Sequence, residues 1–243
     1  MKIEFFSSVI GVADTFPILE SKKNLPSWMS DARRDFSEKQ NKRDLTITKC
    51  PGIVEALTKG FLVTSWHDID VVSTDNDLNA GSPSEQLNDM LGNPTLQIQS
   101  GDGIGKFLPR RPWSNKNILK INTPWHIKSN VKFLMIPVPY TTMFEFESCV
   151  GVLDPAISSE INVQGYVNGR GTFTIKAGQP ICQLIPLTEE QYDFVVRDMN
   201  EEDQIWLKKR TYLNNSGFSL NKSALRAAYG KFIGKFKKCP FAK

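Results

Sequence analysis

The stretch from Asn117 to Leu187 places the strongest limit on the fold, because short apolar segments alternate there with turn residues. The turns are Asn122-Thr123-Pro124, Ser129-Asn130, Pro139-Tyr140, Asp154-Pro155, Asn168-Gly169 and Ala177-Gly178-Gln179. Strands that recur at about eight to twelve residues must each bury one face against a second sheet. We therefore expect a mainly β fold, a jelly-roll-like β-sandwich with a short N-terminal helix and C-terminal helices.

The N-terminal part of the chain adds a helix and further strands to this prediction. Residues 20–49 are polar and charged, which predicts a long surface loop held on the body by Trp28 and Phe36. Proline at a first helical position predicts a short helix from Pro51. β-Branched and aromatic residues at period two then predict a core strand over Phe61–Val72.

The C-terminal part carries helix signals. Thr188 and Gln191 form a capping box, which predicts a helix with an apolar stripe that reaches Met199. Asn200 can cap a second helix. We expect residues 1–187, with the polar loop at 20–49, to form the β-sandwich domain, and residues 188–243 to form a helical, basic extension packed on the same domain.

Charge is spread unevenly along the chain. Ten of its 30 Lys and Arg residues lie in Lys208–Lys243, which contains no acid, so 20 basic residues stand against 26 acidic ones before it. Such a basic region attracts anionic partners, either phosphate backbones or anionic lipid, although a packed helix with a solvated lysine face explains it equally well. The candidate contacts to an anion or nucleic acid are Arg226, Lys231, Lys235, Lys237 and Lys238.

Cysteine and histidine usage narrows the chemistry. The four cysteines are isolated from one another and form no CxxC pair, so a zinc ribbon is not expected, and we interpret them as reduced thiols. Two histidines cannot supply a three-histidine metal site. We therefore expect no metal and no cofactor.

The two histidines still mark the most site-like segments. A possible ligand pocket comprises Trp66, His67, Asp68, Asp70, Trp125 and His126. An iron site of two histidines and one carboxylate is the alternative, but regular strand alternation turns Asp68 and Asp70 away from His67. A hydrogen-bonded structural His67, and a buried Trp125 beside an outward His126, explain the same residues without a ligand.

Two further groups of residues allow chemistry. Glu145 and Glu147 alternate with phenylalanines, so they give two carboxylates on one strand face, for acid–base work, for a cation, or for contact with water. Basic residues at 106–111 precede Trp113, a basic–aromatic cluster that can grip phosphate but is also ordinary in an extended loop.

The strand block also carries a family likeness. The segments ILKINTPWHIKSNVKFLMIPVPY, GVLDP and TFTIKAGQPICQLIPL, with the earlier KCPGIVEALTKGFLVTSWHDIDV, resemble a family of proteins of unknown function from tailed bacteriophages, marine cyanophages among them, and some bacteria. The resemblance covers roughly Lys49–Leu187. It implies a phage-type β-sandwich in the host cytoplasm or the virion, and it supplies no catalytic residues.

The segment Gly178–Leu184 resembles a hairpin of dUTPase-like and cupin-like barrels, in which a glycine turn leads into a strand whose glutamine pairs inside. No glycine-rich C-terminal arm of the dUTPase type follows, so we interpret this likeness as shared barrel geometry rather than activity.

These observations lead to two hypotheses of function. The first is a non-catalytic binding or structural module, which carries no signal peptide and no membrane span and which can self-associate through free sheet edges. The alternative is a metal-dependent enzyme of the cupin or 2-oxoglutarate oxygenase type that uses His67 and His126.

Overall fold

The computed structural model describes residues 1–39, 47–75, 77–100 and 112–209 of the 243-residue chain. The chain divides into two compact units, Met1–Asp198 and Met199–Lys243. Strand accounts for 42% of the structure and helix for 22%, so the prediction of a mainly β, jelly-roll-like fold is confirmed.

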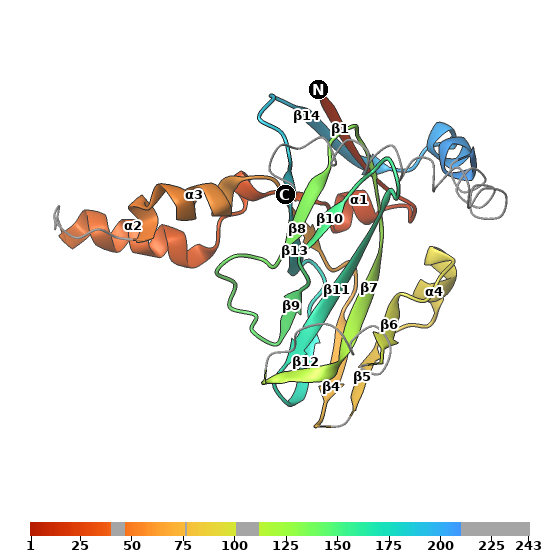
Figure 1. Ribbon diagram of the computed structural model, residues 1–243, viewed down its shortest axis with the longest axis horizontal. Helices are drawn as coiled ribbons and strands as arrows, with labels where there is room; N and C mark the ends of the chain where they lie inside the picture. Colours follow the sequence, from red (N-terminus) through yellow and green to blue (C-terminus); the bar gives the residue numbers. More distant parts are fainter. Residues whose placement is uncertain (40–46, 76, 101–111, 210–243) are drawn as a thin grey trace, which may run out of the picture. The chain divides into compact units, whose positions relative to one another are not determined.

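The largest sheet is built around one long strand, β7 (Ser114–Lys128) (Figure 1). Its order is β14 (Asp193–Asp198), β1 (Lys2–Ser7), β7, β11 (Glu160–Asn168) and β9 (Phe146–Ser148), and β6 (Leu96–Gln99) also pairs with β7. The pair of β1 and β14 is parallel, whereas the other pairs are antiparallel. The turn expected at Asn122–Pro124 is absent, because β7 continues through these residues opposite a register shift in β11.

Two smaller sheets make up the rest of the β-structure in the described residues. One has the order β10 (Gly151–Leu153), β8 (Phe133–Ile136), β13 (Pro180–Pro186), β3 (Phe61–Thr64) and β2 (Leu19–Glu20). The other has the order β12 (Gly171–Ile175), β4 (Ile69–Ser73) and β5 (Leu78–Gly81). The ring of Phe5 on β1 lies 4.8 Å from Phe61 on β3 and 6.2 Å from Phe133 on β8. The largest sheet and the sheet that contains β3 and β8 therefore pack face to face across one hydrophobic core.

Short helices connect the strands of the first unit. They are α1 (Val12–Thr15), α2 (Ser27–Lys39), α3 (Pro51–Thr58) and α4 (Gln86–Leu91), with 3-10 turns at Ser21–Lys23 and Ile47–Lys49. The helix predicted from Pro51 is confirmed as α3, which has proline in its first turn and is followed by Gly60 at φ +82°.

The prediction of a long surface loop over residues 20–49 is wrong, because helix α2 occupies Ser27–Lys39. Polar composition suggested a loop, but Met, Ala, Arg, Glu and Lys are also good helix formers. Met29 is fully buried, and Trp28 contacts Tyr140, as an anchoring aromatic should. The side chain of Phe36 lies outside the described residues.

The prediction of a single strand over Phe61–Val72 is also wrong. This segment forms two strands, β3 and β4, which belong to different sheets. The break falls at Ser65–Asp68. There the Ser65 hydroxyl donates to the His67 carbonyl oxygen at 2.6 Å, and the Ser65 amide donates to the Gln179 carbonyl oxygen at 2.9 Å. These bonds turn the chain from one sheet to the next.

The helix expected from Thr188 to Met199 is replaced by β14, which extends the largest sheet beside β1. The Asp193 amide donates to the Met1 carbonyl oxygen at 2.9 Å, so the edge of β1 determines this conformation. In the second unit residues 201–209 are helical, as predicted. Asn200 and Asp203 cap this helix reciprocally through their side chains and amides, at 2.9 and 3.1 Å.

Within the described residues, no helix is both long enough and apolar enough to cross a bilayer.

Candidate active site

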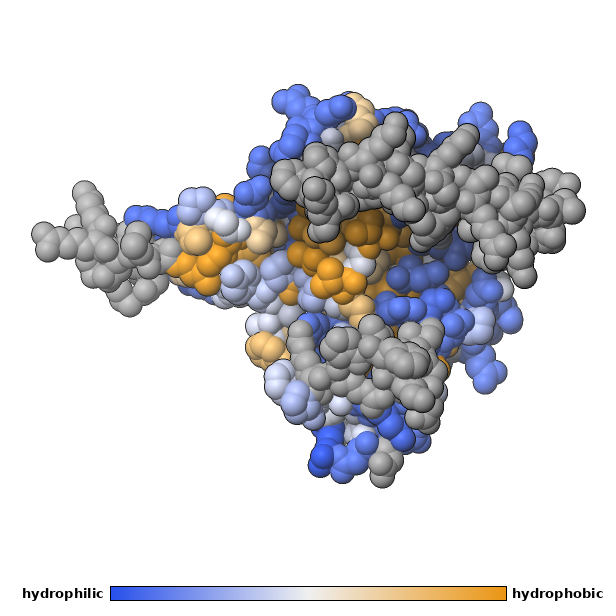
Figure 2. Space-filling model, viewed as in Figure 1, coloured by the Kyte–Doolittle hydropathy of each residue, from blue (hydrophilic) through white to orange (hydrophobic). Residues whose placement is uncertain are grey.

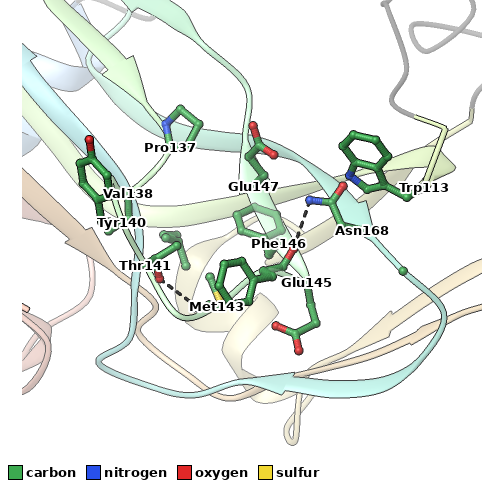
Figure 3. A pocket seen from close by; sticks show the side chains of 13 residues that line it. Trp113, Pro137, Val138, Tyr140, Thr141, Met143, Glu145, Phe146, Glu147 and Asn168 are labelled. Carbon is green, nitrogen blue, oxygen red and sulfur yellow. Dashed lines mark hydrogen bonds between the residues drawn. The ribbon is translucent and has the colours of Figure 1, made fainter. Parts of the chain in front are cut away.

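A cavity of about 530 Å³ with mostly apolar walls, called the large cavity below, opens beside the loop between β8 and β9 (Figure 3). Its 13 lining residues are Trp113, Pro137, Val138, Tyr140, Thr141, Met143, Phe144, Glu145, Phe146, Glu147, Asn168, Gly169 and Ile181. Most of them come from the β8–β9 loop and β9, and the rest come from the ends of β7, β11 and β13. A cavity of this size accommodates a small-molecule ligand.

Three aromatic side chains at this cavity remain open to solvent. Trp113 is 61% exposed, Phe144 74% and Tyr140 49%. Large exposed aromatic rings are costly to keep in water, and they offer flat surfaces on which a planar ligand can stack. Tyr140 also has a φ of +53°, a left-handed conformation that a tyrosine rarely adopts and that often marks functional loops.

Two carboxylates line the same cavity. Glu145 precedes β9 and Glu147 lies within it, on either side of the buried Phe146. Figure 3 shows the carboxylates of Glu145 and Glu147 on opposite sides of the Phe146 ring. The pair noticed in the sequence therefore lies at a cavity rather than on a plain solvated face, where each carboxylate can accept a proton or contact a cation.

Asn168 holds the wall of this cavity together. Its amide N–H donates to the Glu145 carbonyl oxygen at 2.7 Å, and its side-chain Nδ2 donates to the Phe144 carbonyl oxygen at 3.1 Å. Its Oδ1 is buried and has no partner among the described residues. The Gly169 amide donates to the Trp113 carbonyl oxygen at 2.9 Å, which positions the indole. An unsatisfied acceptor at a cavity wall suits a hydrogen-bond donor from a ligand.

The pocket predicted around His67 is a packed turn. Trp66 and His67 are both buried, and their ring centroids lie 5.1 Å apart. The Nδ1 of His67 lies 2.7 Å from the Asp68 carbonyl oxygen and 3.5 Å from the Ser82 hydroxyl. Burial lowers the pKa of His67 below its ordinary value, so the neutral imidazole is favoured.

The two predicted aspartates serve the neighbouring β12 segment. The Asp68 carboxylate accepts from the Ala177 amide at 2.8 Å and from the Lys176 ammonium at 3.1 Å, and these bonds lower its pKa. The Asp70 carboxylate accepts from the Thr174 hydroxyl at 2.6 Å. Both side chains therefore hold strand pairing together.

Trp125 and His126 lie on β7 and face opposite sides of it. Trp125 is fully buried in the hydrophobic core, whereas His126 stacks on the Phe6 ring at 5.2 Å. His67 and His126 thus contact different sets of residues. Among the described residues, no three His, Cys, Asp or Glu side chains gather as metal ligands would, and an iron enzyme is not supported.

The basic residues proposed as anion contacts, Arg226, Lys231, Lys235, Lys237 and Lys238, lie outside the described residues, so that role stays a prediction. Residues 106–111 of the basic–aromatic cluster also lie outside them, whereas Trp113 lies at the cavity.

Comparison with known families gives the decisive observation. The dUTPase family model matches residues 108–215, a range that includes all 13 residues around the large cavity. This chain is similar to dUTPases. The match spans 108 of the 243 residues. No curated protein matches the chain.

The dUTPase match corrects two expectations. The resemblance to a phage family of unknown function is wrong, because the matching family is a known enzyme family. The hypothesis of a non-catalytic binding or structural module is wrong for the same reason, since the matching family consists of nucleotide-hydrolysing enzymes. In the sequence, the hairpin at Gly178–Leu184 was the segment that resembled dUTPase-like barrels, and it lies within the matched range. The match to the dUTPase family model extends beyond this hairpin, over residues 108–215.

Gln183 shows why that hairpin is informative. It is buried, and its Nε2 donates to the carbonyl oxygens of Ala56 at 2.9 Å and Lys59 at 2.6 Å. The glycine turn before it is formed by Gly178 at φ +80°. The glutamine therefore pairs inside the protein, where it fixes the end of α3.

Proposed function

We propose that this protein is a nucleotide hydrolase of the dUTPase type and that the large cavity holds its substrate. The observation that carries the proposal is the family match over residues 108–215, which contains every residue of the cavity wall. The chemistry of the wall supports it, because the cavity offers aromatic surfaces, carboxylates and an unsatisfied acceptor.

Each of these features has a counterpart in dUTP. The uracil ring can stack on an exposed aromatic, Trp113, Phe144 or Tyr140, since every base has a flat π-face. The buried Oδ1 of Asn168 needs a donor, and the N3–H of uracil is one. Cytosine carries an acceptor at the same ring position, so this contact favours uracil.

The carboxylates of Glu145 and Glu147 can supply the base that hydrolysis needs. In hydrolysis, water forms a new bond to a phosphorus atom, the bond to the leaving phosphate breaks, and the water proton passes to a base. Glu145 or Glu147 can take that proton. Magnesium that arrives bound to the triphosphate is held in proteins by one or two carboxylates plus substrate phosphates, and Glu145 or Glu147 can contribute one such carboxylate.

The test is hydrolysis of dUTP by the full chain, compared with dTTP, dCTP and UTP. Released phosphate is measured with and without added pyrophosphatase, which identifies the bond that breaks. We expect dUTP to be the best substrate, and Glu145→Gln or Glu147→Gln to lower kcat at least tenfold. Glu85→Gln, an exposed acid outside the matched range, is the control. Absence of dUTP hydrolysis by the folded wild type would refute the proposal.

We also infer that the protein self-associates. β10 is an edge strand on which Val152 is 61% exposed; Val150, just before the strand, is 67% exposed and Ile157, after it, 70%. Figure 2 shows hydrophobic surface where Figure 1 places β8 and β10. dUTPases are typically homotrimers, which fits an apolar edge that another copy covers. Light scattering after size exclusion is expected to give an oligomer that Val152→Lys dissociates, and a monomeric wild type would contradict this inference.

A further inference from the structure

A second cavity, of about 320 Å³, lies over β7 and has a different character from the first. Its wall is mostly polar and includes Gln97, Lys120, Asn122, His126, Glu160 and Asn162. We call it the polar cleft. It shares no residue with the large cavity, and several of its residues precede the range that matches dUTPases.

Strand alternation explains why these polar groups gather there. Leu119 and Ile121 on β7 are fully buried in the core, so Lys120 and Asn122 face the other side of the sheet. The partner strands continue the polar face in register. Gln97 on β6 pairs with Lys120, and Asn162 on β11 pairs with Asn122.

Asn122 is the clearest sign that this face is more than a solvated surface. Its side chain is only 6% exposed, and its Nδ2 donates to the Pro94 carbonyl oxygen at 2.6 Å. Its Oδ1 is buried without a partner among the described residues. An unpaired buried acceptor destabilises the protein, and a hydrogen-bond donor in the cleft would satisfy it.

Lys120 supplies a charge beside this acceptor. Its side chain is half-buried on the wall of the cleft, and it makes no ion pair within the described part of the chain. Glu160, the acid in the cleft wall, pairs with His126 in the sheet, whereas Gln164 pairs with Lys120. An unpaired, partly desolvated ammonium group attracts an anionic group strongly.

The far end of the cleft offers a rigid wall and acceptors. His126 is held by its stacking on Phe6 at an interplanar angle of 13°, and its Nδ1 lies 3.4 Å from the Ser159 hydroxyl. The Glu160 carboxylate accepts from the Asn162 side chain at 3.2 Å and is exposed, so it can accept further bonds. The cleft thus presents a cation at one end and acceptors at the centre and the other end.

We propose that the polar cleft binds a phosphorylated sugar, either free or as part of a nucleotide. Lys120 would contact the phosphate, while Asn122 Oδ1 and the Glu160 carboxylate would accept bonds from sugar hydroxyls. The volume of the cleft is sufficient for such a ligand. This site is separate from the cavity assigned to dUTP hydrolysis, and the proposal does not depend on that activity.

The test is isothermal titration calorimetry of the full chain in phosphate-free buffer. Ribose 5-phosphate, dUMP and inorganic phosphate are each titrated into the protein. We expect ribose 5-phosphate to bind more tightly than inorganic phosphate, because only the sugar satisfies Asn122. Lys120→Met keeps the aliphatic stem, and it should weaken binding about tenfold or more. Lys116→Met, an exposed lysine on the same strand outside the cleft, is the matched control and should bind as wild type.

The outcomes separate the sources of the ligand and the two proposals. Tight binding of dUMP alone, lost in Lys120→Met, supports a nucleotide, whereas binding of both sugar phosphates supports the sugar phosphate itself. Equal binding of inorganic phosphate, unchanged affinity in Lys120→Met, or no binding of either sugar phosphate overturns the proposal. Binding of dUMP that is lost only in Glu145→Gln places it in the large cavity, which also overturns the cleft site. Sugar-phosphate binding without dUTP hydrolysis would refute the proposed activity alone.

Discussion

The indole Nε1 of Trp28 on α2 donates a hydrogen bond to the backbone carbonyl oxygen of Tyr140 at 3.2 Å, and the two rings meet edge to face at 6.0 Å. This contact joins residues 112 positions apart. It connects α2 to the β8–β9 loop, which forms much of the large cavity, at the residue whose φ is positive. Helix α2, which lies where the sequence predicted a loop, thus contacts Tyr140 at the edge of the candidate active site.

Trp28→Phe keeps an aromatic ring but removes the donor. We expect the free energy of unfolding in urea to fall by about 0.5–1 kcal/mol, the usual contribution of one hydrogen bond. Tyr140→Phe keeps the backbone carbonyl and the ring, so it should unfold as wild type does. Equal stability of Trp28→Phe and wild type would show that this hydrogen bond contributes nothing.

Gly165 on β11 leaves room for the ring that forms the base of the large cavity. A Cβ at this position would collide with the Phe146 ring and lie 2.9 Å from the Glu147 carbonyl oxygen. Gly165→Ala is therefore expected to destabilise the protein by about 1–3 kcal/mol and to lower dUTP turnover by shifting Phe146. Gly151→Ala, where a Cβ meets nothing within 4 Å, is the control and should change neither quantity.

Stability should fall in mildly acidic solution because of His67. Burial lowers the pKa of His67 in the folded protein below 6.5, so the unfolded chain binds its proton more readily. The contribution of neutral His67 is complete above about pH 6.5 and is lost as the pH falls below it, by at most about 1.4 kcal/mol per pH unit. The lowered pKa values of Glu4 and Asp68 act at more acidic pH.

Urea denaturation between pH 7.5 and 5 measures this effect. His67→Gln removes the titrating group, so its free energy of unfolding should change less with pH over that interval. The same slope in variant and wild type would mean that other groups determine the acid sensitivity.

Gln183→Glu should be among the more damaging single changes in the core. A carboxylate would replace the two N–H donors that face the carbonyl oxygens of Ala56 and Lys59. We expect a loss of about 2–4 kcal/mol in the free energy of unfolding, because both carbonyls lose their partner and the new charge is buried. At Gln179 the side-chain oxygen already acts as acceptor for the Lys176 amide, so Gln179→Glu is the control and should be tolerated. Similar stability of the two variants would contradict this reasoning.

The candidate site was only partly visible in the sequence. The spacing of Glu145 and Glu147 drew attention to two acids that line the large cavity, but it gave no sign that Asn168 and Trp113 would line it as well. Those residues come together because β7, β9 and β11 are neighbours in the sheet, a pairing between distant segments that local patterns do not encode. His67 and Trp125 attracted attention by residue type, and tertiary packing shows both of them buried.

The sequence by itself determined the mainly β class, the helix that begins at Pro51 and the cap at Asn200, since these follow from turn chemistry, side-chain periodicity and local hydrogen bonds. Tertiary structure decided the rest. Residues 193–198 satisfy helical and strand spacing alike, and the open edge of β1 selected the strand. Likewise, Phe61–Val72 is split between two sheets, and the polar cleft forms over β7, because strands from distant parts of the chain pair side by side there.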